Sequence, residues 1–202
     1  MSDITPTRSA VIALADERRA MHDSYVFLDE KCLLLAQAML KELREYERLS
    51  ASLGEALAEA AGALQGALAR HGLDGLQRYP AADPAGAAPS VSRRALMGVR
   101  LQEASLGAAG EPQLAPVNPS PEAEASRTAH AAVLSLAARL AALWGNLERL
   151  YREYRRTVRR VRALQDVLLP EVDRSIYEIE TSLEELERDE AVWLRRRPGA
   201  DS

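Results

Sequence analysis

Apolar residues that recur in alternating steps of three and four constrain this chain more than any other feature. In the first third of the sequence the stripe consists of Leu14, Met21, Tyr25, Leu28, Cys32, Leu35, Met39, Tyr46, Leu49 and Leu53. Only Arg18 and Glu42 interrupt it. This spacing is the core pattern of a coiled coil. The stretch between Pro6 and His71 contains no proline, so the pattern predicts one long helix that packs along a second one.

The last third of the chain has a matching stripe. Its members are Val133, Leu136, Leu140, Leu143, Leu147, Leu150, Tyr154, Val161, Leu164, Leu168, Val172, Ile176, Ile179, Leu183 and Leu186. The steps of four near Val172 form a stutter, which locally unwinds a supercoil. Pro170 lies at the stutter and removes a backbone donor, so we expect a bend there. In the first stripe we expect a slip of one position after Leu53, to Leu57, Leu64 and Leu68.

Helix start and stop signals divide the chain into segments. Thr5-Pro6 and Ser120-Pro121 each place a capping residue before a proline at the first helical position, and Gly72 is a stop signal. We therefore expect a first helix over 1–71, a second over 121–197 and a tail over 198–202. The segment 72–120 holds six of the ten prolines and six of the eleven glycines. Within it, alternating residues around Gly98 predict a short β-hairpin near 91–106.

Two long helices joined by an insert most simply fold back on each other, so the predicted fold is all-α, a long antiparallel two-helix coiled coil with a loop-rich middle segment. We expect Leu68 near Val133 and Leu14 near Leu183. Opposite charges on the two helices favour this register. The expected partners are Glu42, Glu45 and Glu47 with Arg149, Arg152, Arg155 and Arg156, and Arg8, Arg18 and Arg19 with Glu178, Glu180, Glu184 and Glu185.

Composition excludes several classes of protein. The apolar fraction is 47% but the aromatic fraction is only 4%, which is typical of helices and offers little material for a compact core. The single cysteine, Cys32, cannot form an intramolecular disulfide, which favours a reducing compartment. The sequence contains no apolar run long enough for a membrane span and no secretion signal at its start, so we expect no direct membrane insertion.

Signals for catalysis are absent from the sequence. His22, His71 and His130 lie far apart and lack the spacing of metal ligands, so we expect no metal site. Cys32 lies on the apolar stripe and is expected to be a core residue rather than a nucleophile. There is no phosphate-binding glycine loop, so we expect no cofactor and no catalytic residues.

Seven arginines fall within residues 149–162, a density that is able to neutralise a nucleic-acid backbone. The net charge of the whole chain is -4, however, and Glu153 interrupts the run. We therefore expect no nucleic-acid binding and favour pairing with carboxylates, which arginine binds through two parallel hydrogen bonds.

The ends of the chain resemble the D subunit of the V-type (archaeal/vacuolar-type) rotary ATPases, in a bacterial form. The resemblance lies in the runs that begin at Thr5, Asp16, Leu28 and Leu33, in Tyr154–Leu164 with Val167-Leu-Leu-Pro170, and in Leu96–Leu101. It implies a non-catalytic central-stalk subunit, a rotor axle that transmits torque between ATP hydrolysis or synthesis and proton or sodium translocation. The implied partners are the A and B subunits of the catalytic hexamer, the small F subunit and the subunit that caps the membrane rotor ring. The implied location is the cytoplasmic side of the cell membrane, as a peripheral part of the complex.

The same resemblance implies where the A/B ring is contacted. The implied contact residues are Arg8, Arg18, Arg19, Asp29, Glu30, Lys31, Arg159 and Arg160. For Asp29 and Glu30 the alternative is pairing within the coiled coil, and we favour such pairing for Arg155 and Arg156. The alternative function for the whole chain is a stand-alone coiled-coil scaffold or chaperone-like interaction protein.

Overall fold

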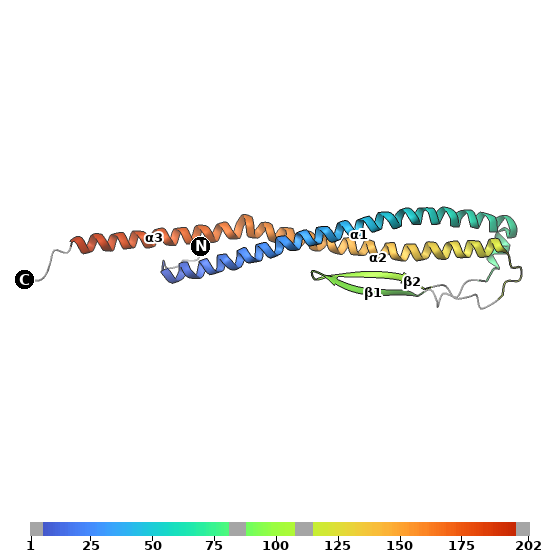
Figure 1. Cartoon of the computed structure of the whole chain (residues 1–202), viewed down its shortest axis with the longest axis horizontal. Helices are drawn as coiled ribbons and strands as arrows, with labels where there is room; N and C mark the ends of the chain where they lie inside the picture. Colours follow the sequence, from blue (N-terminus) through green and yellow to red (C-terminus); the bar gives the residue numbers. More distant parts are fainter. Residues whose placement is uncertain (1–5, 81–87, 108–114, 197–202) are drawn as a thin grey trace, which may run out of the picture. The chain divides into compact units, whose positions relative to one another are not determined.

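The computed structural model describes residues 6–80, 88–107 and 115–196. Two long helical stretches pack together, with a short antiparallel β-hairpin between them in the sequence (Figure 1), and this confirms the predicted fold class. The elements are α1 (Arg8–Gln77), β1 (Pro89–Leu96), β2 (Val99–Leu106), α2 (Pro121–Ala163), the π-helical segment η2 (Leu164–Leu168) and α3 (Leu169–Arg196).

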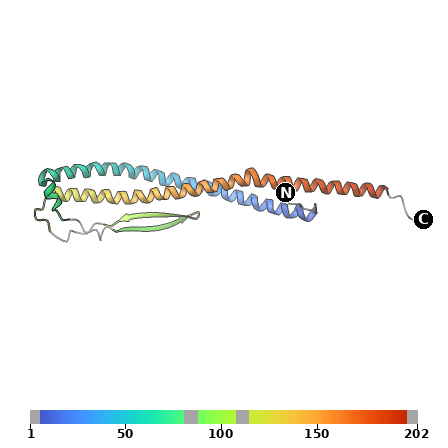
Figure 2. The same ribbon diagram turned by 180° about the vertical axis from the view of Figure 1, so that it is seen from behind.

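The chain divides into two units, each built around antiparallel helices (Figures 1 and 2). Unit 1 comprises residues 1–34 and 154–202, and unit 2 comprises residues 35–153. In unit 1, Arg8 near the start of α1 donates to Glu187 near the end of α3 at 2.6 Å. In unit 2, Arg70 donates to Glu122 at 3.0 Å, which brings the far end of α1 to the start of α2.

The Arg70–Glu122 contact corrects the predicted register in unit 2. Leu68 lies two residues from Arg70, so it is placed near the first turn of α2 and not near Val133. The error has a simple cause, because an apolar stripe of uniform spacing fits its partner equally well at several heptad offsets.

The buried seam of α1 runs through Leu35, Glu42, Leu49, Ala60 and Ala67. Together with the half-buried Met39, Tyr46, Leu53, Ala56 and Ala63, these positions keep the three–four spacing without a break, so the predicted slip after Leu53 is wrong. Alanine takes over the seam positions from residue 56 onward. The leucines of the predicted slipped seam are Leu57, Leu64 and Leu68, and all three are exposed.

Most of the predicted core residues are shielded from solvent. Leu35, Val161 and Ile179 are buried. The half-buried members are Leu14, Met21, Tyr25, Leu28, Cys32, Met39, Leu164, Ile176 and Leu183. Leu168 belongs to the predicted core as well, but it is 39% exposed, and Val172 is buried instead.

The π-helical segment η2 explains the exposure of Leu168. In η2 the Leu169 N–H donates to the carbonyl oxygen of Leu164, five residues earlier, so the turn holds one residue more than an α-turn. Pro170 follows directly, at the place where the sequence predicts a bend. A proline in a regular α-helix clashes with the carbonyl four residues before it. The wider π-turn lies directly before this proline. The extra residue in the π-turn rotates Leu168 out of the seam.

The helix ends follow local capping chemistry. The Thr7 hydroxyl accepts the N–H of Ala10 at 3.2 Å, so Thr7 caps α1, whereas the predicted cap Thr5 lies outside the described residues. The Ser120 hydroxyl accepts the N–H of Ala123 at 3.2 Å, as expected for the start of α2. Gly72, with φ 67°, interrupts α1 at the predicted stop, but helical residues resume and continue to Gln77.

The hairpin lies within unit 2. Its strands pair from Pro89 opposite Leu106 to Leu96 opposite Val99, close to the predicted range. Met97 and Gly98 both have positive φ, as a two-residue hairpin turn of type I′ requires. Val99 and Leu101 of β2 are buried, whereas β1 is exposed along almost its whole length. The hairpin therefore contributes its β2 side to the core of unit 2.

Candidate functional site

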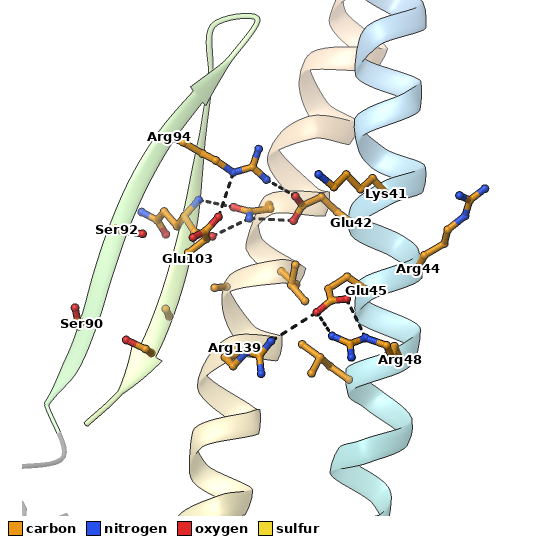
Figure 3. A pocket seen from close by; sticks show the side chains of 17 residues that line it. Lys41, Glu42, Arg44, Glu45, Arg48, Ser90, Ser92, Arg94, Glu103 and Arg139 are labelled. Atoms are coloured by element: carbon orange, nitrogen blue, oxygen red, sulfur yellow. Dashed lines mark hydrogen bonds and ion pairs between the residues drawn. The ribbon is translucent and has the colours of Figure 1, made fainter. Parts of the chain in front are cut away.

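A buried carboxylate lies between the helices and the hairpin of unit 2. Glu42 interrupts the apolar seam of α1 and is only 6% exposed. Its Oε1 accepts a hydrogen bond from Arg94 of β1 at 2.6 Å, and its Oε2 accepts one from Asn146 of α2 at 3.2 Å (Figure 3). A buried charge requires such partners, because desolvation without them costs several kcal/mol. Glu42 thereby links α1 to both α2 and the hairpin.

Asn146, which is 1% exposed, holds the backbone of β2. Its Oδ1 accepts the Gln102 N–H at 2.8 Å, and its Nδ2 donates to the Gln102 carbonyl oxygen at 2.8 Å. Arg149 donates to the Gln102 side-chain oxygen and to Asn146 Oδ1, each at 3.1 Å. We refer to Glu42, Arg94, Gln102, Asn146 and Arg149 as the hairpin anchor.

A cavity of about 710 Å³ lies beside the hairpin anchor, between the hairpin and the two helices of unit 2 (Figure 3). Its charged lining consists of Lys41, Arg44, Arg48, Arg94 and Arg139 with Glu42, Glu45 and Glu103. Glu45 accepts from Arg48 at 2.6 Å, and this hydrogen bond lowers the pKa of Glu45. Each carboxylate here is already paired with an arginine, so the lining offers no free general base.

This arrangement corrects the charge pairing that the sequence predicts. Glu42 pairs with Arg94 and Glu45 with Arg48 and Arg139, rather than with the arginines at 149, 152, 155 and 156. Arg152 pairs with Glu148 on its own helix. The hairpin inserts its own cation beside the seam, and the spacing of the helices does not reveal this. Two signals in the sequence point to it: a glutamate at a seam position, and an asparagine within the apolar run of α2.

The three predicted ring-contact arginines near the start of α1 are exposed and paired within unit 1. Arg8 donates to Glu187 and Arg18 to Asp173, and both contacts raise the pKa of the arginine through the hydrogen bond first and the charge second. Arg19 lies 3.5 Å from Asp16 on the same helix. The expected acidic partners are residues 178–185 of α3, so the general pairing of these helix ends is right and the individual partners differ.

The other predicted ring-contact residues are spread along unit 1. Asp29 and Glu30 are exposed and form no hydrogen bond or ion pair with any residue that the structure describes. Lys31 is half-buried. Arg159 donates to the backbone oxygen of Arg155 at 3.3 Å, and Arg160 is exposed. These residues do not form one cluster.

His71 and His130 form hydrogen bonds within the fold, and Cys32 is half-buried. His71 shares a 2.6 Å hydrogen bond with the capping residue Ser120, and His130 contacts the backbone oxygen of Ser126 at 2.7 Å. Burial raises the pKa of the Cys32 thiol, and the nearby Asp29 adds to this shift.

No three His, Cys, Asp or Glu side chains within residues 6–80, 88–107 and 115–196 are placed to hold a metal ion. None of the described helices combines the length and the apolar content that a membrane crossing requires.

Comparison with known proteins identifies the family. The family model described as the ATP synthase D subunit matches residues 10–197, almost the whole chain. The chain belongs to the ATP synthase D-subunit family. The match covers α1 from residue 10 onward, the hairpin, α2, η2 and α3, so it includes the whole hairpin anchor.

Individual members of the D-subunit family align over nearly their full length. The chain is 27% identical to the V-type ATP synthase D subunit of Thermotoga neapolitana over 194 residues, with 96% of each chain covered. It is 28% identical to the A-type ATP synthase D subunit of Thermococcus kodakarensis, with 96% of this chain and 92% of that protein covered. It is 29% identical to the V-type ATP synthase D subunit of Anaeromyxobacter sp. (strain K), with 97% and 96% covered. The alignments with these relatives therefore cover almost the whole length of both proteins.

Proposed function

We propose that the chain is the non-catalytic central-stalk subunit, or rotor axle, of a V-type rotary ATP synthase. In this role it transmits torque between ATP hydrolysis or synthesis on the A/B hexamer and proton or sodium translocation through the membrane ring. The observation that carries the proposal is the D-subunit family match over residues 10–197, on a chain made of paired helices. A helix pair supports this role because it is stiff and presents different side chains in different directions.

The proposed partners are the A and B subunits, the small F subunit and the subunit that caps the rotor ring. The proposed place of the complex is the cytoplasmic side of the cell membrane. For the A/B ring we propose contact through the exposed charges of unit 1. Asp29 and Glu30 are the best candidates, because they have no ionic partner among the described residues and so remain available.

Reconstitution with A and B subunits tests the proposal. We expect a single complex that hydrolyses ATP, and we expect the double charge reversal Asp29→Arg with Glu30→Arg to lower its ATP hydrolysis severalfold. The matched control is Glu55→Arg with Glu59→Arg, which reverses two exposed charges of α1 in unit 2. Helicity measured by circular dichroism should stay unchanged in both variants, because all four side chains are exposed.

Two results would contradict the proposal. One is an equal loss of ATP hydrolysis in the control variant. That result would argue against a ring contact through Asp29 and Glu30. The other is elution of the chain alone while A and B assemble and work without it. The second result would favour the alternative, a stand-alone coiled-coil scaffold.

A further inference from the structure

Positive charge is in excess at one end of the cavity beside the hairpin anchor. Glu45 is the carboxylate at this end, and it lies between the guanidinium groups of Arg48 and Arg139 (Figure 3). Arg48 donates one hydrogen bond to each oxygen of Glu45, at 2.6 and 3.0 Å. Because this pair of bonds neutralises Glu45, the positive charge of Arg139 is left over.

Arg139 also has its hydrogen-bond donors available. Its Nη2 lies 3.6 Å from Oε1 of Glu45, and it donates no hydrogen bond to any residue that the structure describes. A guanidinium group carries five N–H donors in a fork that fits two oxygens of a phosphate or a carboxylate. The Arg139 side chain is 47% exposed and lines the cavity, so a small ligand is able to reach it.

The hairpin brings two hydroxyl groups to the cavity. Ser90 of β1 and Ser105 of β2 are direct partners in the strand pairing, and both line the cavity. Among the described residues, neither hydroxyl has a hydrogen-bond partner. A pair of hydroxyls on one face of a hairpin is able to donate to the same anionic group.

The register of the elements places these hydroxyls at the Arg139 end. Asn146 of α2 holds the backbone of Gln102, and β2 runs from there toward Arg139 (Figure 3). Ser105 comes three residues after Gln102, which is about 10 Å along a strand. Arg139 comes seven residues before Asn146, which is about 10.5 Å along a helix. Ser105 and its strand partner Ser90 therefore lie at the same level as Arg139.

The cavity also has an apolar wall. Leu49 of α1, Leu143 and Ala142 of α2 and Ala104 of β2 contribute to its lining, and Leu49 is only 4% exposed. The volume of about 710 Å³ falls within the range of about 300–1,000 Å³ that is typical of small-molecule sites. Such sites combine apolar walls with a few polar groups that orient the ligand.

The charge of the lining limits how many anionic groups the ligand carries. Arg44 points away from the cavity (Figure 3), and without it the charged lining consists of four cations and three carboxylates. The excess of one positive charge suits a single phosphate group, which carries about −1.5 to −2 near pH 7. At the other end of the cavity Arg94 is shared by Glu42 and Glu103. These two carboxylates would repel the further charges of a polyphosphate.

We propose that the cavity binds a small phosphate ester with an apolar body. The phosphate accepts hydrogen bonds from Arg139 and from the hydroxyls of Ser90 and Ser105. The apolar body lies against Leu49 and Leu143. Because unit 2 of this chain supplies the whole lining, the inference goes beyond the proposed function and does not depend on it.

Isothermal titration calorimetry of the full chain with phenyl phosphate tests the inference. We expect one saturable site per chain and a dissociation constant at least tenfold lower than that of inorganic phosphate or phenol, because each of these lacks one half of the ligand. Parallel titrations with adenosine monophosphate and with monomeric dihexanoyl phosphatidate distinguish the two sources of such a group. Tighter binding of the first indicates a nucleotide, and tighter binding of the second indicates a lipid headgroup.

Substitutions locate the site. Arg139→Gln should raise the dissociation constant of phenyl phosphate about tenfold, whereas Arg152→Gln should leave it unchanged. Arg152 is the matched control, an exposed arginine of the same helix that is paired with Glu148 outside the cavity. Ser105→Asp, at an exposed position, should abolish binding because it places a carboxylate beside the phosphate.

Two results would overturn the inference. One is the absence of saturable binding of phenyl phosphate to the parent chain. The other is equal weakening by Arg139→Gln and Arg152→Gln, which would indicate general attraction to exposed arginines. Circular dichroism checks that each variant keeps the helicity of the parent chain. Reconstitution with A and B subunits is a separate measurement, so a failure of the proposed function and a failure of this inference are distinguishable.

Discussion

Asn146 of α2 connects the hairpin and α1 within unit 2. Its amide group satisfies both backbone polar groups of Gln102, and it also donates to the carboxylate of Glu42. Buried polar groups that lose their partners cost about 1–3 kcal/mol each, which exceeds the net gain from forming an ordinary hydrogen bond. The hairpin is therefore fixed to the helices by a few hydrogen bonds in addition to the apolar contacts of Val99 and Leu101.

We predict that Asn146→Ala lowers the free energy of unfolding by about 3 kcal/mol, because it leaves the Gln102 backbone and one oxygen of Glu42 unpaired in a buried place. Urea denaturation followed by circular dichroism measures the loss. The matched control is Asn118→Ala, which removes an exposed amide outside the helices and strands and should change stability by less than about 0.5 kcal/mol. Similar losses in both variants would show that Asn146 does not anchor the hairpin.

At the scale of whole elements, the sequence predicts the helices and the hairpin well but their mutual register poorly. Helix starts are local events, and Ser120 caps α2 through its own hydroxyl as its sequence context indicates. The seam of α1 beyond Leu53 is different, because alanine occupies it and alanine is equally common on exposed faces. The leucines at 57, 64 and 68 draw the predicted seam to the wrong flank, and their exposure becomes visible only once the packed flank is known.

The hairpin anchor escapes prediction for a similar reason. Glu42 is visible as a break in the stripe, but its partners come from the hairpin and from α2, far away in the sequence. The spacing of one helix carries no information about which distant backbone will lie beside it. The individual charges proposed for ring contact are untested by the fold of a single chain and remain predictions.

The first turn of α2 gives a pH-dependent prediction. The pKa of Glu122 is lowered, chiefly by a hydrogen bond from its own backbone N–H and further by Arg70, against a smaller opposing effect of burial. A carboxyl whose pKa is lower in the folded chain adds stability above its unfolded pKa, near 4.3, and loses that contribution as the pH falls through the folded pKa. We predict that Glu122→Gln is less stable than the parent chain at pH 7 and that the two converge toward pH 3.

Urea denaturation at several pH values between 3 and 7 measures this difference. Glu17→Gln serves as the control, since Glu17 is exposed and pairs with no described residue. A stability difference between Glu122→Gln and the parent chain that stays constant across this pH range would contradict the assignment.

At the scale of the whole molecule, the two units differ in how well they exclude water. In the described part of unit 1 the buried side chains are Thr157, Val161, Val172 and Ile179. Unit 2 buries a longer series, which includes Leu35, Leu49, Leu101 and Leu150 together with the hairpin anchor residues Glu42 and Asn146. Local opening is easier where few apolar contacts must be broken.

We predict that backbone amides of unit 1 exchange with deuterium at least tenfold faster than those of unit 2 in the isolated chain. Hydrogen–deuterium exchange with peptide-level mass spectrometry measures this, and residues 10–34 and 35–60 of α1 provide an internal comparison within one helix. Uniform protection along α1 would contradict the prediction. Assembly with A and B subunits should slow the exchange of unit 1 if its exposed charges are the ring contacts.

The π-turn at Leu164–Leu168 has a consequence for comparing this chain with its relatives. It absorbs one residue without ending the helix, so each side chain after it lies about 100° behind the direction that an uninterrupted α-helix would give it. A relative that lacks the extra residue will therefore align correctly only with a one-residue gap inside an otherwise continuous helix. A substitution carried across by position number alone would then probe a solvent-facing side chain in one protein and a seam residue such as Val172 in the other.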